Sequence, residues 1–291
     1  MLWDFEYFEP VTISEAINLL NRFGAGAKVI AGGTDLLVDM KDEKIRPKFL
    51  VSIMKIPQLK YIIEDGGALR IGAATTLAEI EESPIVREKY GLITEAVKAL
   101  GTVQVRNMAT IGGNICNAIP SADLPPALVT LDAQVKIAGI NGERTLPLDE
   151  FFVGVRKTRM NNELLTEITV RQPPGHSGTA FIKLSRTSED LAMVNVATRI
   201  TLNKEGVCQE ARIAIGGGVG PTLLRPREAE KILEGKKLDE ETIRLAAEIS
   251  CQKFQCRPTS IRAHPEYKIE AGKALVKRAL VKALGRAGGG K

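Results

Sequence analysis

Apolar residues in the first 56 positions follow a helical period in one segment and form short runs in two others. Residues 12–23, T-I-S-E-A-I-N-L-L-N-R-F, place apolar side chains on one face and begin with capping hydroxyls, which predicts a helix. The run 27–31 predicts a short strand, residues 36–40 predict at least one helical turn, and residues 49–53 predict a second buried strand. This order of elements predicts a small α/β unit.

Alternating apolar and polar positions predict two hairpins in the middle of the chain. The segment 59–73 has two alternating runs around D-G-G at 65–67, and a second pair of runs turns at N-G at 141–142. Helices with a threonine cap or a proline start are expected between these hairpins. The apolar run 163–170 then closes the segment, which predicts a second unit that combines helices with an antiparallel sheet.

The loop 171–178, R-Q-P-P-G-H-S-G, is the strongest predicted boundary in the chain. Beyond it the pattern predicts three antiparallel strands and then several helices. The sequence thus predicts an α+β protein with three domains: an α/β part at 1–56, an α+β part at 57–174, and a C-terminal domain at 175–291 that holds a three-stranded antiparallel sheet with helices.

The composition of the 291 residues is that of an ordinary globular protein, with 44% hydrophobic and 26% charged residues. The net charge of +5 is modest, and only 4% of residues are aromatic, so we expect no nucleic-acid partner. No apolar run approaches the roughly 20 residues of a membrane span. The first ten residues are acidic and aromatic, unlike a signal peptide, and the expected location is the cytoplasm.

Residues that bind metals are few in this sequence. The four cysteines lie at 116, 208, 251 and 256, and the most economical interpretation is buried or partly buried free thiols. The two histidines, at 176 and 264, lie in loop-like contexts apart from the cysteines. No zinc or iron–sulfur spacing is present, so we expect no metal site and infer that redox chemistry in this chain would need an organic cofactor.

Two doubled glycines carry the candidate chemistry: A-G-G-T-D at 31–35 and I-G-G-N at 111–114. Glycine permits positive φ and close approach of a ligand, and consecutive N–H groups that point the same way form an anion nest. Two such nests would suit a pyrophosphate, whereas each doubled glycine alone could equally be a plain tight turn. The glycine-rich run 213–220 lacks the spacing of a dinucleotide fingerprint and predicts a strand followed by a turn.

Four motifs in order carry a resemblance to a known family: A-G-G-T-D at 31–35, A-T-I-G-G-N-I at 109–115, S-A-D-L at 121–124 and F-I-K-L-S-R-T-S-E-D-L-A at 181–192. Together they resemble the FAD-binding subunit of the xanthine dehydrogenase family of molybdenum hydroxylases, which includes the medium subunit of carbon monoxide dehydrogenase. The resemblance covers nearly the whole chain. It implies a PCMH-type FAD-binding fold, followed by a C-terminal domain of the CO dehydrogenase flavoprotein type.

The resemblance also implies a set of cofactor-binding residues and no catalytic residue. The set is Val29, Ile30, Ala31, Gly32, Gly33, Thr34, Asp35, Leu36, Leu100, Thr110, Ile111, Gly112, Gly113, Asn114, Asp123, Leu165 and Lys183. In the family, both glycine segments hold the pyrophosphate through main-chain N–H groups. By the same resemblance Arg186, Glu189 and Asp190 match a segment over the flavin ring.

Several of these residues have ordinary structural alternatives. Asp123 is implied to accept hydrogen bonds from the ribose or adenine, its alternative is to cap the helix that follows it, and both roles could coexist. Lys183 is implied to lie at the pyrimidine edge of the flavin, or else it is a surface lysine on a strand. Leu165 is a flavin contact or a core residue, and Leu100 stands where many relatives have an aromatic ring.

The implied function is electron transfer within a larger complex. A molybdenum–pterin large subunit would oxidise the substrate, a subunit with [2Fe–2S] clusters would pass single electrons, and the FAD of this chain would deliver them to NAD+ or another acceptor. The implied assembly is a heterotrimer or a dimer of heterotrimers. One alternative is a stand-alone FAD-dependent oxidoreductase of PCMH fold, and another is an interaction protein whose glycine turns are only structural.

Overall fold

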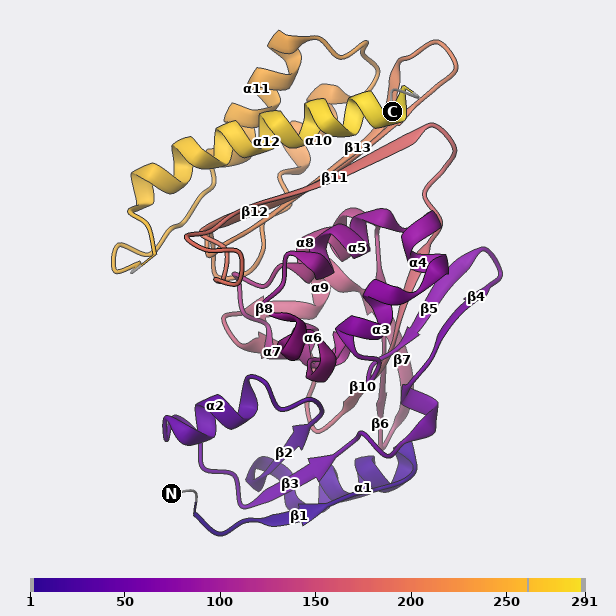
Figure 1. Cartoon of the computed structure of the whole chain (residues 1–291), viewed down its shortest axis with the longest axis vertical. Coiled ribbons are helices and arrows are strands. Elements are labelled where there is room, and N and C mark those ends of the chain that lie inside the picture. The colour runs from indigo at the N-terminus through magenta and orange to yellow at the C-terminus, as the bar shows by residue number, and fades with distance from the viewer. Residues whose placement is uncertain (1–2, 261, 289–291) are drawn as a thin grey trace. The chain divides into compact units, whose positions relative to one another are not determined.

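The computed structural model describes residues 3–260 and 262–288, and the chain folds into two compact units. Unit 1 comprises Met1–Ser83, Thr102–Ala118 and Ala133–Val170, and unit 2 comprises Pro84–Gly101, Ile119–Asp132 and Arg171–Lys291. The chain therefore passes between the units several times, as the colours of Figure 1 show. The three predicted domain boundaries follow chain order, and they remain predictions.

Unit 1 begins with a three-stranded parallel sheet. Its order is β1 (Glu6–Phe8), β3 (Phe49–Ser52) and β2 (Ala27–Ile30), with β3 in the centre. Helix α1 (Ile13–Phe23) packs against it through Ala16, Ile17 and Leu20, and the Thr12 side chain caps the helix by accepting from the Glu15 N–H. Helix α2 (Leu36–Lys41) follows β2.

The second sheet of unit 1 is antiparallel and has five strands in the order β4-β5-β10-β6-β7. The strands are β4 (Ile62–Asp65), β5 (Ala68–Gly72), β10 (Leu164–Arg171), β6 (Gln134–Gly139) and β7 (Gly142–Pro147). Both predicted hairpins are present. The first turns at 66–67, within the predicted D-G-G, and the second turns at 140–141, one residue before the predicted N-G, because Gly142 already pairs with Gly139. A two-stranded ribbon, β8 (Phe152–Gly154) and β9 (Lys157–Thr158), follows helix α9 (Leu148–Phe151).

Three short helices of unit 1 follow β5 in the structure. Helix α3 (Leu77–Glu82) has a full capping box, in which Thr76 and Glu79 satisfy each other's backbone N–H groups. It packs beside α6 (Val103–Met108), which Thr102 caps. Helix α7 (Ile111–Asn117) comes next, and it contains the second doubled glycine.

Unit 2 is built on a three-stranded antiparallel sheet of β11 (Ser177–Leu184), β12 (Val194–Leu202) and β13 (Cys208–Gly216). Every residue of the central strand β12 is buried. The long helix α12 (Pro265–Ala287) lies along β11 and β12, so closely that a Cβ on Gly178 would meet the Ala283 carbonyl oxygen at 2.0 Å. Figure 1 shows α12 running along these strands.

Five further helices complete unit 2. Helices α10 (Arg227–Leu233) and α11 (Glu240–Cys251) pack with α12 around a core of aliphatic side chains. Helices α4 (Pro84–Lys89), α5 (Gly91–Lys98) and α8 (Leu124–Thr130) come from the two earlier segments, and α8 packs against β12 and β13. The predicted α+β class and the C-terminal three-stranded sheet are confirmed.

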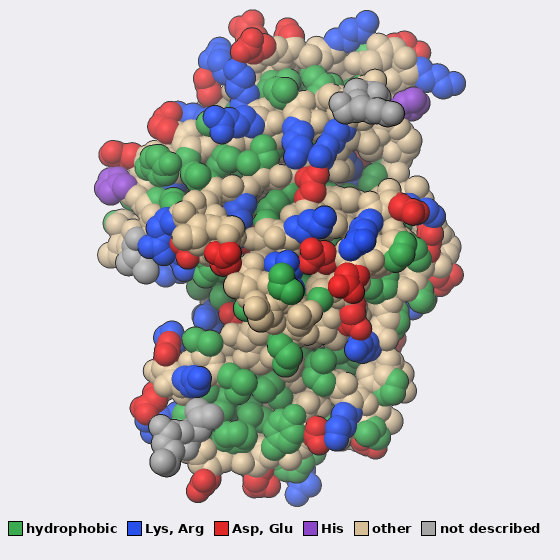
Figure 2. Space-filling model, viewed as in Figure 1, with side chains coloured by type: hydrophobic (Ala, Val, Ile, Leu, Met, Phe, Trp, Pro, Cys, Tyr) green, Lys and Arg blue, Asp and Glu red, His purple; other side chains and the backbone are tan. Residues whose placement is uncertain are grey.

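Figure 2 shows charged side chains of both signs on one face of the described residues. On the face in Figure 2, acidic and basic side chains are interspersed, consistent with the modest net charge of +5. Among the described residues, no helix is long and apolar enough to cross a lipid bilayer.

Candidate functional site

The first doubled glycine forms a tight turn between β2 and α2. Gly33 has φ of 71°, a conformation that glycine adopts without steric cost. Gly32 has an ordinary φ but no room for a side chain, because a Cβ there would lie 1.7 Å from the Met108 carbonyl oxygen. The turn therefore requires glycine twice, once for backbone conformation and once for close approach to the end of α6.

The backbone N–H groups of this turn are available to a ligand. In the part of the chain that the structure describes, the N–H groups of residues 32–35 donate to no protein acceptor. The carbonyl groups of Gly33 and Asp35 instead accept from the N–H groups of Leu37 and Asp39, both at 3.0 Å, and so begin helix α2. Consecutive unused donors beside a glycine with positive φ have the character of an anion nest.

The Asp35 carboxyl group lies at the edge of this turn. The residue is exposed, but its carboxyl group lies near Asp39 and Arg156 and accepts a hydrogen bond from the Asn117 side chain. Partial burial raises the pKa of the Asp35 carboxyl above its ordinary value of 3.8, and the Asn117 hydrogen bond and the Arg156 charge oppose that rise. A carboxylate beside free amide donors would repel an anionic ligand, so its protonation state matters to binding.

The second doubled glycine has a different structure from the first. Thr110 caps helix α7, and Gly112 and Gly113 lie in the first turn of that helix. The four N–H groups that follow the cap all donate within the protein: Ile111 to the Thr75 carbonyl at 3.0 Å, Gly112 to the Ala73 carbonyl at 2.9 Å, Gly113 to Thr110 Oγ1 at 3.1 Å, and Asn114 to the Thr110 carbonyl at 3.0 Å. The prediction of a second nest is therefore wrong, because the threonine cap and helix formation use the donors that a nest would present.

The two glycines of α7 differ in what surrounds them. A Cβ on Gly112 would lie 2.6 Å from the Ala73 carbonyl oxygen, so this glycine lets the helix pack closely on the chain after β5. A Cβ on Gly113 would meet only Thr110 Oγ1, at 3.0 Å. The Asn114 Oδ1 atom is buried and has no hydrogen-bond partner in the protein. What this segment offers a ligand is thus the side-chain amide of Asn114 and an open position at Gly113.

The remaining predicted residues of unit 1 have simple settings. Val29 and Ile30 end strand β2, and Leu36 is the first residue of α2; all three are half-buried. Leu165 is buried in β10, opposite Ile137 of β6, which is the environment of a core residue.

Unit 2 brings three other predicted residues together. Lys183 Nζ donates to Asp123 Oδ2 at 2.8 Å and to the carbonyl of Ala99, the residue before Leu100, at 2.7 Å. The side chains of Lys183 and Asp123 are only 7% and 3% exposed. The alternative of a surface lysine is therefore wrong. Asp123 does stand at the N-cap position of α8, as its alternative predicted, but its carboxyl group makes no capping bond. Burial raises the pKa of Asp123, and Lys183 opposes that rise.

The contact between Asp123 and Lys183 constrains their roles. A carboxylate and an ammonium group 2.8 Å apart act on the same part of any ligand. The resemblance implied separate contacts, with the ribose or adenine for Asp123 and with the pyrimidine edge of the flavin for Lys183, and the structure places the two side chains side by side.

Asn195 is a member of this cluster that the sequence analysis missed. Its amide Nδ2 donates to Asp123 Oδ1 at 2.8 Å and to the Ala122 carbonyl at 3.1 Å, while its Oδ1 is buried without a partner. The register of β11 and β12 sets Lys183 opposite Asn195. The sequence does show a lone amide in the otherwise apolar start of β12. This is a weak indication unless the pairing of β11 with β12 is already known.

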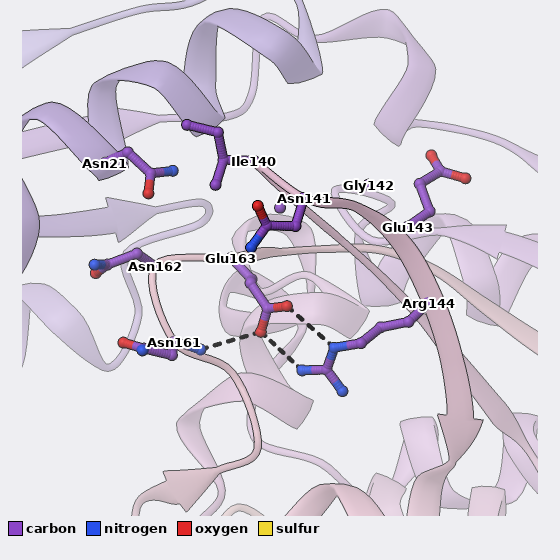
Figure 3. A pocket seen from close by; sticks show the side chains of 10 residues that line it. Asn21, Ile140, Asn141, Gly142, Glu143, Arg144, Asn161, Asn162 and Glu163 are labelled. Atoms are coloured by element: carbon purple, nitrogen blue, oxygen red, sulfur yellow. Dashed lines mark hydrogen bonds and ion pairs between the residues drawn. The ribbon is translucent and has the colours of Figure 1, made fainter.

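Other candidate features lie apart from these residues. Arg186 Nε donates to Asp190 at 2.8 Å, an exposed pair next to Glu189. A polar pocket of about 220 Å³ in unit 1 is lined by residues of α1, the turn between β6 and β7, and 161–163, and none of the predicted residues lines it. Figure 3 shows the bidentate pair of Arg144 and Glu163 in it. Among the described residues, no group of three or more potential metal ligands is present.

Comparisons with known proteins match nearly the whole chain. The family described as the FAD binding domain in molybdopterin dehydrogenase matches residues 3–173, and the CO dehydrogenase flavoprotein C-terminal domain matches residues 179–283. The carbon monoxide dehydrogenase medium chain of Hydrogenophaga pseudoflava is 36% identical over 285 residues, which cover 97% of this chain and 98% of that one. The 6-hydroxypseudooxynicotine dehydrogenase complex subunit alpha of Paenarthrobacter nicotinovorans is 35% identical over a match that covers 97% of this chain and 95% of that one.

Solved structures agree with these sequence matches. The structure of carbon monoxide dehydrogenase from Hydrogenophaga pseudoflava that lacks the Mo-pyranopterin moiety of the molybdenum cofactor superposes with a TM-score of 0.95 at 36% identity. The match covers 98% of this chain and 99% of that chain.

Proposed function

Because the chain belongs to the family of FAD-binding subunits of molybdenum hydroxylases, we propose that it accepts electrons from [2Fe–2S] clusters of a partner subunit and passes them to NAD+ or another acceptor. The observation that carries this proposal is the turn at 32–35, whose free N–H groups and two obligatory glycines suit the pyrophosphate of FAD. FAD, when bound, takes up electrons singly or in pairs, which lets it join one-electron carriers to a two-electron acceptor.

The residues of unit 1 fit such a cofactor without a metal or a lysine at the pyrophosphate. The turn at 32–35 would supply main-chain donors, and Gly33 would hold them in one direction. Asn114 has a buried oxygen that still lacks a donor, as expected of a group that meets a ligand. The absence of a Cβ at Gly113 would let that ligand approach α7.

The residues of unit 2 support a second role in cofactor binding. Lys183 Nζ is buried and donates to Asp123, and Asn195 donates to the other oxygen of the same carboxyl group. A donor that is fixed in this way favours an electron-rich ligand group beside it, because it needs no reorganisation when negative charge develops. We therefore retain Leu100, Asp123 and Lys183 as proposed cofactor contacts and add Asn195 as the residue that orients them.

The proposed partners are an iron–sulfur subunit and a molybdopterin-binding large subunit, in a heterotrimer or a dimer of heterotrimers. The similar proteins support an assembly. They are named as a medium chain and as a complex subunit, and they match this chain over nearly its whole length.

Purification of the intact complex from its source tests the proposal. We expect the chain to co-purify with two other subunits, and we expect the absorption spectrum to contain flavin and iron–sulfur bands. Addition of substrate should bleach both bands, and NAD+ should restore them if it is the acceptor. A purified chain with stoichiometric FAD that turns over an organic substrate alone would instead establish the stand-alone oxidoreductase.

A further inference from the structure

Arg156 occupies an unusual backbone position in unit 1. It lies in the turn between β8 and β9 with φ of 56°, in the left-handed region that favours glycine. Glycine would adopt this conformation without steric cost, so the turn itself does not require arginine. The long charged side chain at this position therefore needs another reason, which its contacts provide.

The backbone and the side chain of Arg156 bind two different helices. Its N–H donates to the carbonyl of Ala118 at 3.0 Å, and Ala118 ends α7 in a left-handed conformation of its own, with φ of 46°. Its guanidinium group makes a two-point contact with Asp39 of α2, in which Nη2 donates to Oδ1 at 3.3 Å and Nη1 donates to Oδ2. Asp39 is only 5% exposed, so the surrounding protein holds its side chain in place for this contact.

These contacts join the two glycine segments. Helix α2 begins directly after the turn at 32–35, and Gly112 and Gly113 lie in the first turn of α7. The hydrogen bond between the side chains of Asn117 and Asp35 makes a second link between the same two helices. The positive charge of Arg156 also acts on Asp35, which is part of the turn. Arg156 thus bonds both to Asp39 of α2 and to Ala118, the C-cap residue of α7.

We propose that Arg156 is a positioning residue for FAD binding. It would hold the free N–H groups of the turn at 32–35 in the direction they need and fix that turn against α7. This inference rests on the proposed function. It assigns a role to a residue that no cofactor motif contains and that lies more than 30 positions beyond both glycine segments.

The experiment uses the full-length chain, freed of flavin and titrated with FAD by fluorescence, together with thermal unfolding in the absence of FAD. Arg156→Gly removes the side chain and suits the backbone of the turn. If the turn then spends about a tenth of its time in the binding geometry, the apparent Kd for FAD rises about tenfold. Arg156→Lys keeps the charge but not the two-point contact, and we expect an intermediate Kd.

Two further variants separate positioning from general loss of charge. Asp39→Asn removes the partner of Arg156, and we expect the double variant to bind FAD no more weakly than either single variant, because both break the same link. Arg144→Ala removes another bidentate arginine of unit 1, the one in Figure 3, and we expect no change in Kd. We expect the midpoint temperature of unfolding of Arg156→Gly to differ from that of the unaltered chain by no more than the midpoint of the Arg144→Ala control does.

The outcomes distinguish the two proposals. If the unaltered chain binds FAD and Arg156→Gly and Arg156→Lys bind it equally well, the role of Arg156 is refuted while the proposed function stands. If the Kd of Arg156→Gly rises only in proportion to a loss of folded protein, the role is likewise refuted. If the unaltered chain, folded by circular dichroism, binds no FAD, the proposed function fails and this inference fails with it.

Discussion

The first doubled glycine follows a strand, whereas the second follows a threonine cap, and this difference in neighbours decides what each can offer a ligand. After β2, the chain turns through Gly32 and Gly33 with its N–H groups unused. After Thr110, the chain enters α7 at once, and the helix and its cap use the N–H groups of residues 111–114. The same Gly-Gly pair therefore leaves backbone N–H donors free in the first segment and permits close packing of α7 in the second.

The comparison also shows that the four glycines serve three purposes. Gly33 provides a left-handed conformation, Gly32 and Gly112 allow backbone to approach backbone, and Gly113 alone has open space around most of its missing side chain. Only at Gly113 is a ligand the main candidate for the reason that glycine is present. Substitutions at these positions should therefore fail in different ways, and the size of each effect tests the comparison.

Gly32→Ala should have the largest effect on folding. The new Cβ would lie 1.7 Å from the Met108 carbonyl oxygen, so the turn or α6 must move. We expect the free energy of unfolding to fall by about 3 kcal/mol or more, as for severe overpacking. Urea unfolding measures this loss, with Gly154→Ala as the control, because a Cβ there meets only Lys157 at 3.9 Å. Equal stability of the two variants would contradict the close approach of the turn to α6.

Gly112→Ala should destabilise the protein less than Gly32→Ala. Its Cβ would meet the Ala73 carbonyl oxygen at 2.6 Å and the Ala73 Cβ at 2.8 Å, where a small shift of α7 gives partial relief. We expect a loss of about 2 kcal/mol, reduced by the higher helix propensity of alanine. Unfolding in urea again provides the measurement, and a variant as stable as the unaltered protein would show that α7 is not packed as described.

Gly113→Ala should separate ligand approach from folding. The Cβ meets only Thr110 Oγ1 at 3.0 Å, and alanine is favoured over glycine in a helix, so we expect stability to change by less than about 1 kcal/mol. If FAD approaches α7 at this point, its Kd should rise about tenfold, which is ~1.4 kcal/mol. The two measurements are urea unfolding and FAD titration of the same preparation. A stable variant with unchanged FAD affinity would remove Gly113 from the site.

Much of the fold could be predicted from the sequence, but less of the candidate site could. The hairpins at 66–67 and 140–141 were predictable because turn residues and alternation act locally. The structure of I-G-G-N was not, because Thr110 can precede either a turn or a helix, and packing on Ala73 selects the helix. The contact of Asp123 with Lys183 joins residues 60 positions apart, and no local pattern specifies such a pairing.

The smallest predicted effect concerns the charge at the edge of the first turn. Burial raises the pKa of Asp35, so this carboxyl is neutral below that raised pKa and negative above it. An ionised Asp35 would repel the pyrophosphate held by the neighbouring N–H groups, and FAD affinity should therefore fall as pH rises through the Asp35 pKa. We expect a change of about threefold, or ~0.6 kcal/mol, because the residue is exposed and solvent screens the repulsion.

Asp35→Asn tests this effect directly, because it removes the charge and keeps the shape of the side chain. FAD titrations of this variant from the ordinary aspartate pKa of 3.8 up to neutral pH should show a flat profile at the higher affinity. The free energy of unfolding should also favour the neutral side chain, because the ionised carboxyl is the disfavoured form in the folded protein. Asp35→Asn should therefore be no less stable than the unaltered protein at neutral pH. Asp65→Asn, an exposed carboxyl of β4 paired with Arg70, is the control and should keep the pH profile of the unaltered chain. If Asp35→Asn also keeps that profile, another group controls the pH dependence, and the turn at 32–35 is not where the charge of the cofactor is felt.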